Sequence, residues 1–345
     1  MTLARFVSTT VLVTAVACSR PAPVAHDAAL VERAHVAMGT EVRLTAVTTD
    51  EAGAASAFDE VFREFDRLES LMTVWRDQSD IARLNQAAGA HPVLISPEVR
   101  EVLVIARQVS EWTHGTFDVT FGALSGLWRF DHDQDDTIPD PDEVRRLLPL
   151  VNYRELVVDE KAGTAFLRRS GMRVNLGGVG KGYAVDRAVA ILRGRGLRDF
   201  MVQAGGDLYA AGRRGDRPWR LGIRDPRGPA DRIFAALDLS DGTFSTSGDY
   251  ERAFVKGGRR YHHILDLSAG EPARGCRSVT LVTGRAVIAD ALAKGVFILG
   301  PDAGMNLIEE LPGVEGVIVA ADNRVLISSG LKDRLVVLAP PTDAP

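Results

Sequence analysis

The stretch "NLGGVGKGYAVDRA", residues 175–188, places four glycines and one lysine within its first eight positions. A strand-like "RV" precedes it, and an apolar pattern typical of a helix follows over about residues 181–195. It is not a P-loop, because Asn175 and Gly182 stand where that motif needs a glycine and a hydroxyl residue. It is not a dinucleotide fingerprint either, because Tyr183 replaces the last glycine. The stretch predicts a strand, a glycine turn and a helix, and it leaves open whether the turn binds phosphate.

The elements on either side of this stretch do not alternate regularly between strand and helix. We expect strand at 34–47, interrupted by "MGT", and a hairpin at 155–168. Apolar residues at helical spacing predict a helix over 51–72, and Ser96 and Pro97 begin another that ends near Gly115. Short strands fill 199–283, and helices near 286–299 and 302–311 precede a final strand pair. The fold class predicted is therefore α+β, with mixed sheets and packed helices.

The composition is that of a soluble globular protein. The 345 residues are 46% hydrophobic and 25% charged, with a net charge of −5. Charges of both signs are mixed along the chain, and there is no basic block or basic–aromatic stripe. These features give no support to nucleic-acid binding.

The N-terminal stretch "MTLARFVSTTVLVTAVAC" has the pattern of a secretory signal. Its apolar run is too short to span a membrane, and it ends in small residues followed by Cys18. We expect a lipoprotein signal over 1–17, a lipidated Cys18 and a tether over 18–34; a plain secretory signal is the alternative. Residues 35–345 are predicted to form a single domain. The expected location is the periplasmic face of a bacterial membrane, inner or outer.

Several polar, glycine-bearing segments interrupt the predicted elements. They supply backbone N–H groups, carboxylates, hydroxyls, an aromatic ring and a histidine pair, which together suit a large, flat, phosphate-bearing ligand and a metal ion. In chain order they are "MGT" (38–40), "LMTVWRDQSDIARLN" (71–85), "GTFDVTFGALSGLW" (115–128), the 175–188 stretch, "QAGGDLYAAG" (203–212), "STSGDYER" (245–252), "HHILDLSAGEP" (262–272) and "IADALAKGVFILG" (288–300).

In this order, these segments resemble the ApbE-like flavin transferases over about residues 35–335. The resemblance implies a T-fold-related architecture with FAD in a central cleft, Mg²⁺ as a cofactor, and transfer of FMN from FAD to a threonine hydroxyl of a partner protein, with release of AMP. It implies that this partner is a membrane redox subunit with a short threonine-containing motif. The resemblance also implies that the glycine stretch holds the FAD pyrophosphate.

The resemblance assigns roles to individual residues. The FAD contacts implied are Met38, Trp75, Thr116, Phe117, Asp118, Asn175, Lys181 and Ile264. The metal site implied consists of the Gly178 carbonyl, the Asp290 carboxylate and position 294. The family often has Asp where Asn175 stands, and typically has Thr where Lys294 stands. Because Lys294 is four residues after Asp290 on one helix face, its ammonium could assist the metal, pair with Asp290 or weaken metal binding.

Phosphoryl transfer needs neutralised phosphate charge and an activated nucleophile. Asp290 with a metal, Lys181 and Lys294 are candidates for the first task. For the second, His263 is the candidate base, because imidazole titrates near neutral pH. Only one of His262 and His263 can face the site if they lie on a strand, and the resemblance selects His263. Asp266 and Asp207 remain alternative bases.

Two further functions compete with FMN transfer. A pyrophosphatase would use the same site to hydrolyse FAD to FMN and AMP, and a flavin-binding lipoprotein would bind without turnover. Separately, the acidic segment 131–142 has Asp131, Asp133 and Asp135 at EF-hand-like positions, but Asp136 and Asp142 depart from that pattern. A solvated acidic loop is the favoured interpretation of this segment.

Overall fold

A computed structural model describes residues 28–130 and 134–344. Its largest sheet has eight strands, and every neighbouring pair is antiparallel. From one edge to the other the strands are β1 (Ala29–Ala37), β2 (Thr40–Thr48), β6 (Phe200–Ala204), β7 (Asp207–Ala211), β10 (Gly242–Gly248), β15 (Cys276–Val282), β16 (Glu315–Ala320) and β17 (Val325–Ile327).

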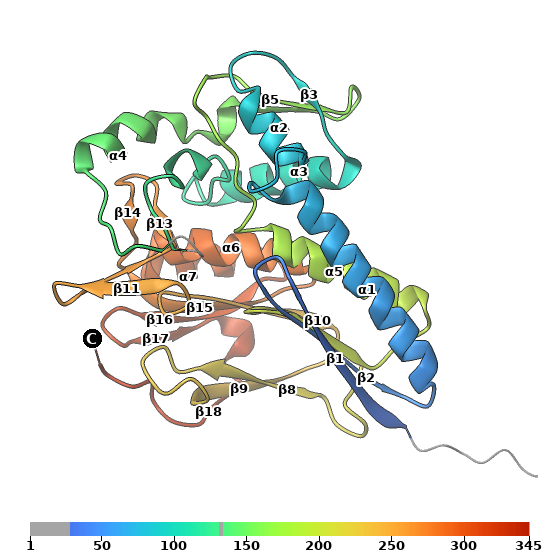
Figure 1. Cartoon of the computed structure of the whole chain (residues 1–345). Helices are drawn as coiled ribbons and strands as arrows, with labels where there is room; N and C mark the ends of the chain where they lie inside the picture. Colours follow the sequence, from blue (N-terminus) through green and yellow to red (C-terminus); the bar gives the residue numbers. More distant parts are fainter. Residues whose placement is uncertain (1–27, 131–133, 345) are drawn as a thin grey trace, which may run out of the picture.

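Helices cover one face of this sheet (Figure 1). The helices packed directly on it are α1 (Glu51–Met72), α5 (Gly180–Gly194), α6 (Ala286–Leu299) and α7 (Pro301–Glu310), and α3 (Pro97–Trp112) packs on α6. Between them and the sheet lies the main hydrophobic core, to which α1 contributes Phe58 and Phe65 and α6 contributes Phe297. The helix α6 packs against α3, α5, α7 and the central strands, so its residues reach the interior from several sides.

A small sheet packs on the opposite side of the molecule (Figure 1). Its strand order is β18 (Leu335–Val337), β9 (Ile233–Leu239) and β8 (Trp219–Arg224). Trp219 and Phe234 pack there with Phe244 of the large sheet in a second hydrophobic cluster. The two faces of the large sheet are thus both buried, but by different kinds of layer.

The remaining elements lie beside these layers. One three-stranded sheet contains β3 (Val93–Leu94), β5 (Thr164–Leu167) and β4 (Leu156–Asp159), and two hairpins pair β11 (Ala253–Lys256) with β12 (Arg259–His262) and β13 (Leu265–Asp266) with β14 (Glu271–Pro272). Two short helices are α2 (Asp80–Gln86) and α4 (Pro141–Leu147), and the 3₁₀ turns are Gly122–Leu124, Leu148–Leu150, Tyr153–Glu155 and Ser329–Leu331. Within the two described ranges, none of the helices has the length and apolarity needed to cross a bilayer.

The α+β class and most of the predicted elements are confirmed. The helix expected over 51–72 is α1, with the same bounds, and Ser96 caps α3 by accepting a hydrogen bond from the Val99 backbone N–H. The hairpin predicted at 155–168 is β4 and β5, and the helix following the glycine stretch is α5. These elements have strong local signals, namely helical periodicity, a capping residue or a turn dipeptide.

Three segments differ from the sequence-based expectation. The strand begins at Ala29, inside the expected tether, because nine residues of β1 pair with β2 across a turn at Met38 and Gly39, both at positive φ. The sequence did not predict the helices α2 and α4, because seven residues each are too few to show a clear helical period.

The acidic segment is partly described. Asp135 pairs with Arg129 at 2.7 Å, and Asp142 lies in the first turn of α4, where it pairs with Arg145. Asp131 and Asp133, like the signal segment 1–17 and Cys18, lie outside the described residues.

Candidate active site

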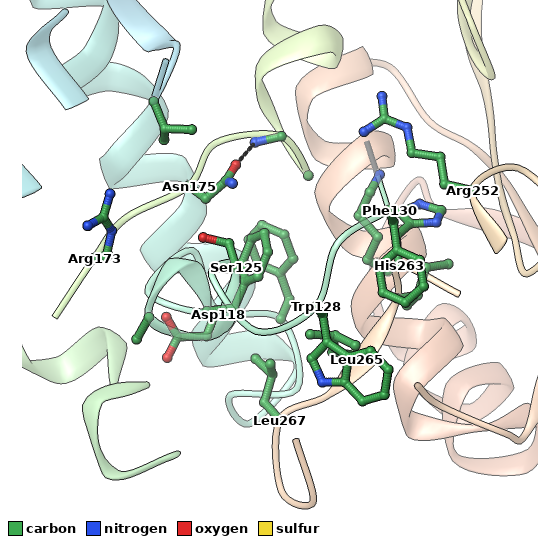
Figure 2. A pocket seen from close by; sticks show the side chains of 18 of the residues that line it. Asp118, Ser125, Trp128, Phe130, Arg173, Asn175, Arg252, His263, Leu265 and Leu267 are labelled. Atoms are coloured by element: carbon green, nitrogen blue, oxygen red, sulfur yellow. Dashed lines mark hydrogen bonds between the residues drawn. The ribbon is translucent and has the colours of Figure 1, made fainter. Parts of the chain in front are cut away.

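A cavity of about 520 Å³ opens beside the N-terminal end of α5, a size typical of small-molecule sites. Most of its lining comes from residues 116–130, the glycine stretch, residues 263–267 and the helix α6, and Val74, Trp75 and Arg252 also contribute. Figure 2 shows Asn175 and His263 reaching toward this space from two different segments. Of the site residues predicted from sequence, those that line it are Trp75, Thr116, Phe117, Asp118, Asn175, Gly178, His263, Ile264 and Lys294.

The glycine stretch is a turn that is held by its own polar groups. The Asn175 side-chain oxygen accepts a hydrogen bond from the Gly177 N–H at 2.8 Å (Figure 2). The Asn175 backbone N–H donates to the Val119 carbonyl at 2.8 Å. At the start of α5, the Gly180 N–H donates to the Leu176 carbonyl at 2.8 Å. Gly177 and Gly178 line the cavity just before α5 begins at Gly180, and the positive end of the helix dipole favours anions there.

Gly182 explains how two helices meet behind this turn. A Cβ atom at Gly182 would lie 2.3 Å from the Ala286 carbonyl oxygen and 2.7 Å from the Asp290 Cβ. Only glycine permits this approach of α5 to α6. As a result, the Gly182 N–H donates to Asp290 Oδ2 at 2.9 Å.

A group of charged residues, here called the Asp290 cluster, lies at this crossing and consists of Asp290, Lys294, Lys181 and Asp207. Lys294 Nζ donates to Asp290 Oδ1 and, at 2.8 Å, to the Asp290 carbonyl oxygen. Lys181 Nζ lies 3.2 Å from Asp207 Oδ2 and 3.9 Å from Asp290 Oδ1. The Asp290 side chain has 0% exposure and that of Lys294 has 15%.

Lys181 and Lys294 keep the Asp290 carboxyl group ionised. Burial opposes ionisation of this carboxyl group, but Lys181 and Lys294 outweigh it and hold the pKa of Asp290 below its usual value. Burial also opposes the charge of Lys181, yet Asp290 and Asp207 raise the pKa of that ammonium. For Asp207, burial and the neighbouring Asp290 charge raise the pKa. Asp290 is therefore an anion held between two ammonium groups.

Aromatic side chains form another part of the lining. Trp75 is 63% exposed at the cavity, whereas Trp128 and Phe130 are buried in a cluster with Phe254 and Tyr261. The rings of Trp128 and Phe130 stack with centroids 5.7 Å apart, and Trp128 Nε1 donates to the Gly270 carbonyl at 2.8 Å. A wall of this kind suits a flat ring system.

The two adjacent histidines point in different directions, as expected from sequence. His262 is buried, and its Nε2 lies 2.8 Å from the Ala273 carbonyl oxygen. His263 lines the cavity, and its buried Nδ1 has no hydrogen-bond partner among the described residues. Burial, together with the nearby charges of Arg252 and Lys294, lowers the pKa of His263 to about 3. Its imidazole is therefore neutral at physiological pH.

Asp118 and Thr116 line the cavity but also brace its wall. Asp118 accepts hydrogen bonds from the Thr120 N–H at 2.8 Å and from the Tyr153 N–H at 2.6 Å. The Thr116 hydroxyl donates to the Gly295 carbonyl of α6 at 3.1 Å. Both side chains thus fix the loop that presents Phe117.

Three predicted site residues are not part of the cavity lining. Lys181 and Asp290 lie behind it in the Asp290 cluster. Met38 packs against the main core, and its backbone N–H donates to Glu69 Oε2 at 3.0 Å. The next residue of its turn lies near Arg252, which lines the cavity, since a Cβ at Gly39 would be 3.7 Å from Arg252 Nη2.

Other lining residues were not predicted from the sequence. Arg252 comes from the start of the β11 hairpin, and Trp128 comes from the loop after α3. Phe130 and Arg173 also line the cavity. The segments "STSGDYER" and "GTFDVTFGALSGLW" contain two of them, but a single sequence gives no signal for which of their residues face a ligand.

Known proteins are similar to this chain in both sequence and fold. The ApbE family model matches residues 38–318. The chain is 34% identical to the FAD:protein FMN transferase of Treponema pallidum over 324 residues, which is 89% of each chain. It is 30% identical to a Klebsiella pneumoniae FAD:protein FMN transferase over 295 residues, covering 85% of this chain and 90% of that protein.

Solved structures agree with the sequence relatives. The crystal structure of the ApbE protein from Thermotoga maritima has a TM-score of 0.82 and 30% sequence identity, and the match covers 89% of this chain and 99% of that one. The flavin transferase ApbE from Vibrio cholerae has a TM-score of 0.80 and 25% identity, with coverage of 89% and 99%.

Proposed function

The chain belongs to the ApbE family, and we infer from this that it is an enzyme, an FAD:protein FMN transferase that moves FMN from FAD to a partner protein. The observation that supports this function best is the cavity itself. Aromatic rings, the glycine turn before α5 and the Lys294 ammonium line one space, which suits both the ring system and the pyrophosphate of FAD.

We propose that the acceptor is a threonine hydroxyl of a membrane redox subunit. The hydroxyl oxygen would attack the phosphorus of the FMN half of FAD, and the bond from that phosphorus to the AMP oxygen would break. AMP leaves with that oxygen, and the hydroxyl proton passes to a base. The products are a phosphoester of FMN on the protein and free AMP.

His263 is proposed as the base. Its buried Nδ1 has no partner among the described side chains and backbone groups, so it can accept a proton. The low pKa of His263 keeps it unprotonated, and the negative pyrophosphate beside it would raise its basicity when FAD binds. His263→Gln should slow transfer by about 10²–10⁴ and leave FAD binding intact. The exposed His91→Gln is the control, and equal rates in the two variants would remove His263 from this role.

The family resemblance implies a Mg²⁺ site formed by the Gly178 carbonyl, Asp290 and position 294. Of the predicted site, Asp290 and the Gly178 carbonyl are oxygen donors, but Lys294 is not, because a protonated ammonium has no lone pair. Lys294 already bonds Asp290 Oδ1, and Lys181 lies 3.9 Å from the same oxygen. Within the described ranges, no group of three or more His, Cys, Asp or Glu residues could hold a metal ion. The residues present therefore do not fit Mg²⁺ at Asp290, and no step above uses it.

FMN transfer is tested by incubating the protein with FAD and candidate acceptors, followed by mass spectrometry of the acceptor and measurement of AMP. We expect one FMN on a threonine of the acceptor for each AMP released, and none when that threonine is changed to valine. Free FMN in place of labelled acceptor would indicate a pyrophosphatase. Bound FAD without AMP would indicate a carrier.

We also propose that the enzyme is anchored on the periplasmic side of a membrane through a lipidated Cys18. Several acyl chains on one residue give stable attachment, whereas a single chain does not. The variant Cys18→Ser should appear in the soluble periplasmic fraction, as measured by fractionation and immunoblotting. If that variant remains with the membrane, the lipid anchor is wrong.

A further inference from the structure

The cavity meets the Asp290 cluster through Lys294 and not through Asp290. Lys294 lines the cavity, whereas Asp290 does not and has 0% side-chain exposure. The two residues are one helical turn apart on α6, so that the ammonium lies over the carboxylate. A ligand that enters the cavity therefore encounters the positive group first.

The Lys294 side chain also fills the space between the two expected oxygen donors of a metal. A Cβ at Gly178 would lie 3.2 Å from Lys294 Cδ and 3.4 Å from Phe117 Cε2. The lysine stem therefore passes against the glycine turn before its ammonium reaches Asp290. A metal ion between Gly178 and Asp290 would have to displace this side chain.

The hydrogen bonds of Lys294 leave it one donor to spare. An ammonium group has three N–H donors. Lys294 Nζ uses two of them on Asp290, one for Oδ1 and one for the backbone carbonyl at 2.8 Å. The third is available to an oxygen atom in the cavity that Lys294 lines.

The local charge also disfavours a further cation. The cluster already pairs two carboxylates, Asp290 and Asp207, with two ammonium groups. Both lysines lie at Asp290 Oδ1, Lys294 bonded to it and Lys181 3.9 Å from it. A divalent ion at the same oxygen would be repelled by both at short range, in an interior where charges are weakly screened.

We propose that in this enzyme the Lys294 ammonium, held in place by Asp290, replaces the divalent cation and binds a pyrophosphate oxygen of FAD, so that FMN transfer needs no metal. This inference rests on the proposed function. As the bond from phosphorus to the AMP oxygen breaks, negative charge grows on the departing phosphate, and Lys294 stabilises it with its remaining N–H. Lys294 is then a catalytic residue, and Asp290 is the residue that positions it.

The test compares the full-length protein with Lys294→Thr and Lys294→Met. FMN transfer to the acceptor is measured with EDTA and with added Mg²⁺, and Mn²⁺ binding is measured by the loss of the free-ion EPR signal. The parent should transfer FMN equally well in EDTA and in Mg²⁺, and should leave Mn²⁺ free. Lys294→Thr should bind Mn²⁺ and lose on the order of 10² in rate when EDTA removes the metal. Lys294→Met, which keeps most of the side chain's length but has neither an N–H donor nor an oxygen ligand, should be slow in both conditions.

Two results would overturn the proposal. One is a parent enzyme that loses transfer in EDTA and recovers with Mg²⁺. The other is Mn²⁺ binding by the parent as tight as that by Lys294→Thr, which counts against the proposal whether or not any FMN is transferred. Failure of the proposed function looks different: no protein would then label the acceptor in any condition, and the Mn²⁺ comparison would still report which side chain excludes the metal.

Discussion

Asp225 and Asp290 are both completely buried carboxylates, yet their surroundings differ. Asp225 lies between β8 and β9 in what we call the Asp225 clasp, formed with Arg227, Gly228, Arg232 and Thr342. It accepts hydrogen bonds from the N–H groups of Arg227 and Gly228 at 3.0 Å each, and from the N–H and hydroxyl of Thr342 at 2.9 and 2.7 Å. Arg232 Nε adds an ion pair at 3.1 Å.

The Asp290 cluster has no such saturation. Asp290 accepts one backbone N–H, that of Gly182, and otherwise depends on the ammonium groups of two lysines. Fixed backbone donors keep a buried charge satisfied whatever else happens, while an ammonium on a long side chain can share its donors with a ligand. The two carboxylates thus differ in the kind of partner and not in the depth of burial, which fits a structural role for Asp225 and the proposed role of Asp290 in positioning Lys294.

Of the substitutions that test this comparison, Asp290→Asn should have the largest effect, and that effect is on the rate of FMN transfer. The amide keeps the shape of the side chain and can still accept from Gly182, but it removes the charge that holds Lys294. The rate of FMN transfer should fall by on the order of 10²–10³, or about 2.7–4 kcal/mol of transition-state stabilisation, while FAD still binds. Transfer is followed by mass spectrometry and binding by flavin fluorescence. Asp302→Asn, an exposed carboxylate on α7, is the control. Unchanged transfer by Asp290→Asn would place this residue outside the mechanism.

The same contrast explains what the sequence could and could not predict. The helix α1 and the start of α3 follow from local signals, the helical spacing of Phe58, Phe62 and Phe65 and the Ser96–Pro97 pair. Lys294 beside Asp290 also followed from spacing, because both lie on one helix.

Contacts between distant parts of the chain left no such signal. Asp225 and Thr342 are 117 residues apart, and Arg252 reaches the cavity from the start of a separate hairpin. The family resemblance supplied the order of the site segments. It could not show that Asp290 lies behind Lys294, because that depends on the crossing of α5 and α6 at Gly182.

A smaller effect, and one on stability, is expected from Asp225→Asn. The new amide nitrogen cannot accept from Thr342, so at least one buried donor loses its partner, at a cost of about 1–3 kcal/mol in the free energy of unfolding. FMN transfer by the folded protein should be unchanged, because Asp225 does not line the cavity. Denaturant unfolding measures the loss, with the exposed neighbour Asp231→Asn as control. A drop in transfer rate at full stability would show that the clasp is not purely structural.

The smallest effect expected is a pH dependence of the difference in unfolding free energy between Asp225→Asn and the parent protein. Burial opposes the charge of Asp225, but the hydrogen bonds from Thr342, Arg227 and Gly228 outweigh it and hold the pKa of the folded carboxyl below its usual value. As pH falls toward the unfolded pKa of about 3.9, the unfolded chain binds a proton that the folded protein does not. The stability contributed by Asp225 is therefore complete above that value and is lost as the pH falls through the folded pKa.

The Asp225→Asn variant has no such proton to bind, so its gap in unfolding free energy from the parent should narrow as pH falls from 6 to 4. Protonation of all other groups is common to the two proteins and cancels in the difference. The narrowing cannot exceed about 1.4 kcal/mol per pH unit, which is the limit for a single proton. Denaturant unfolding of both proteins at pH 6, 5 and 4 measures it. A gap that stays constant would mean that the charge of Asp225 contributes nothing beyond the shape of its side chain, and Asp290 would then be the only one of the two carboxylates whose charge matters.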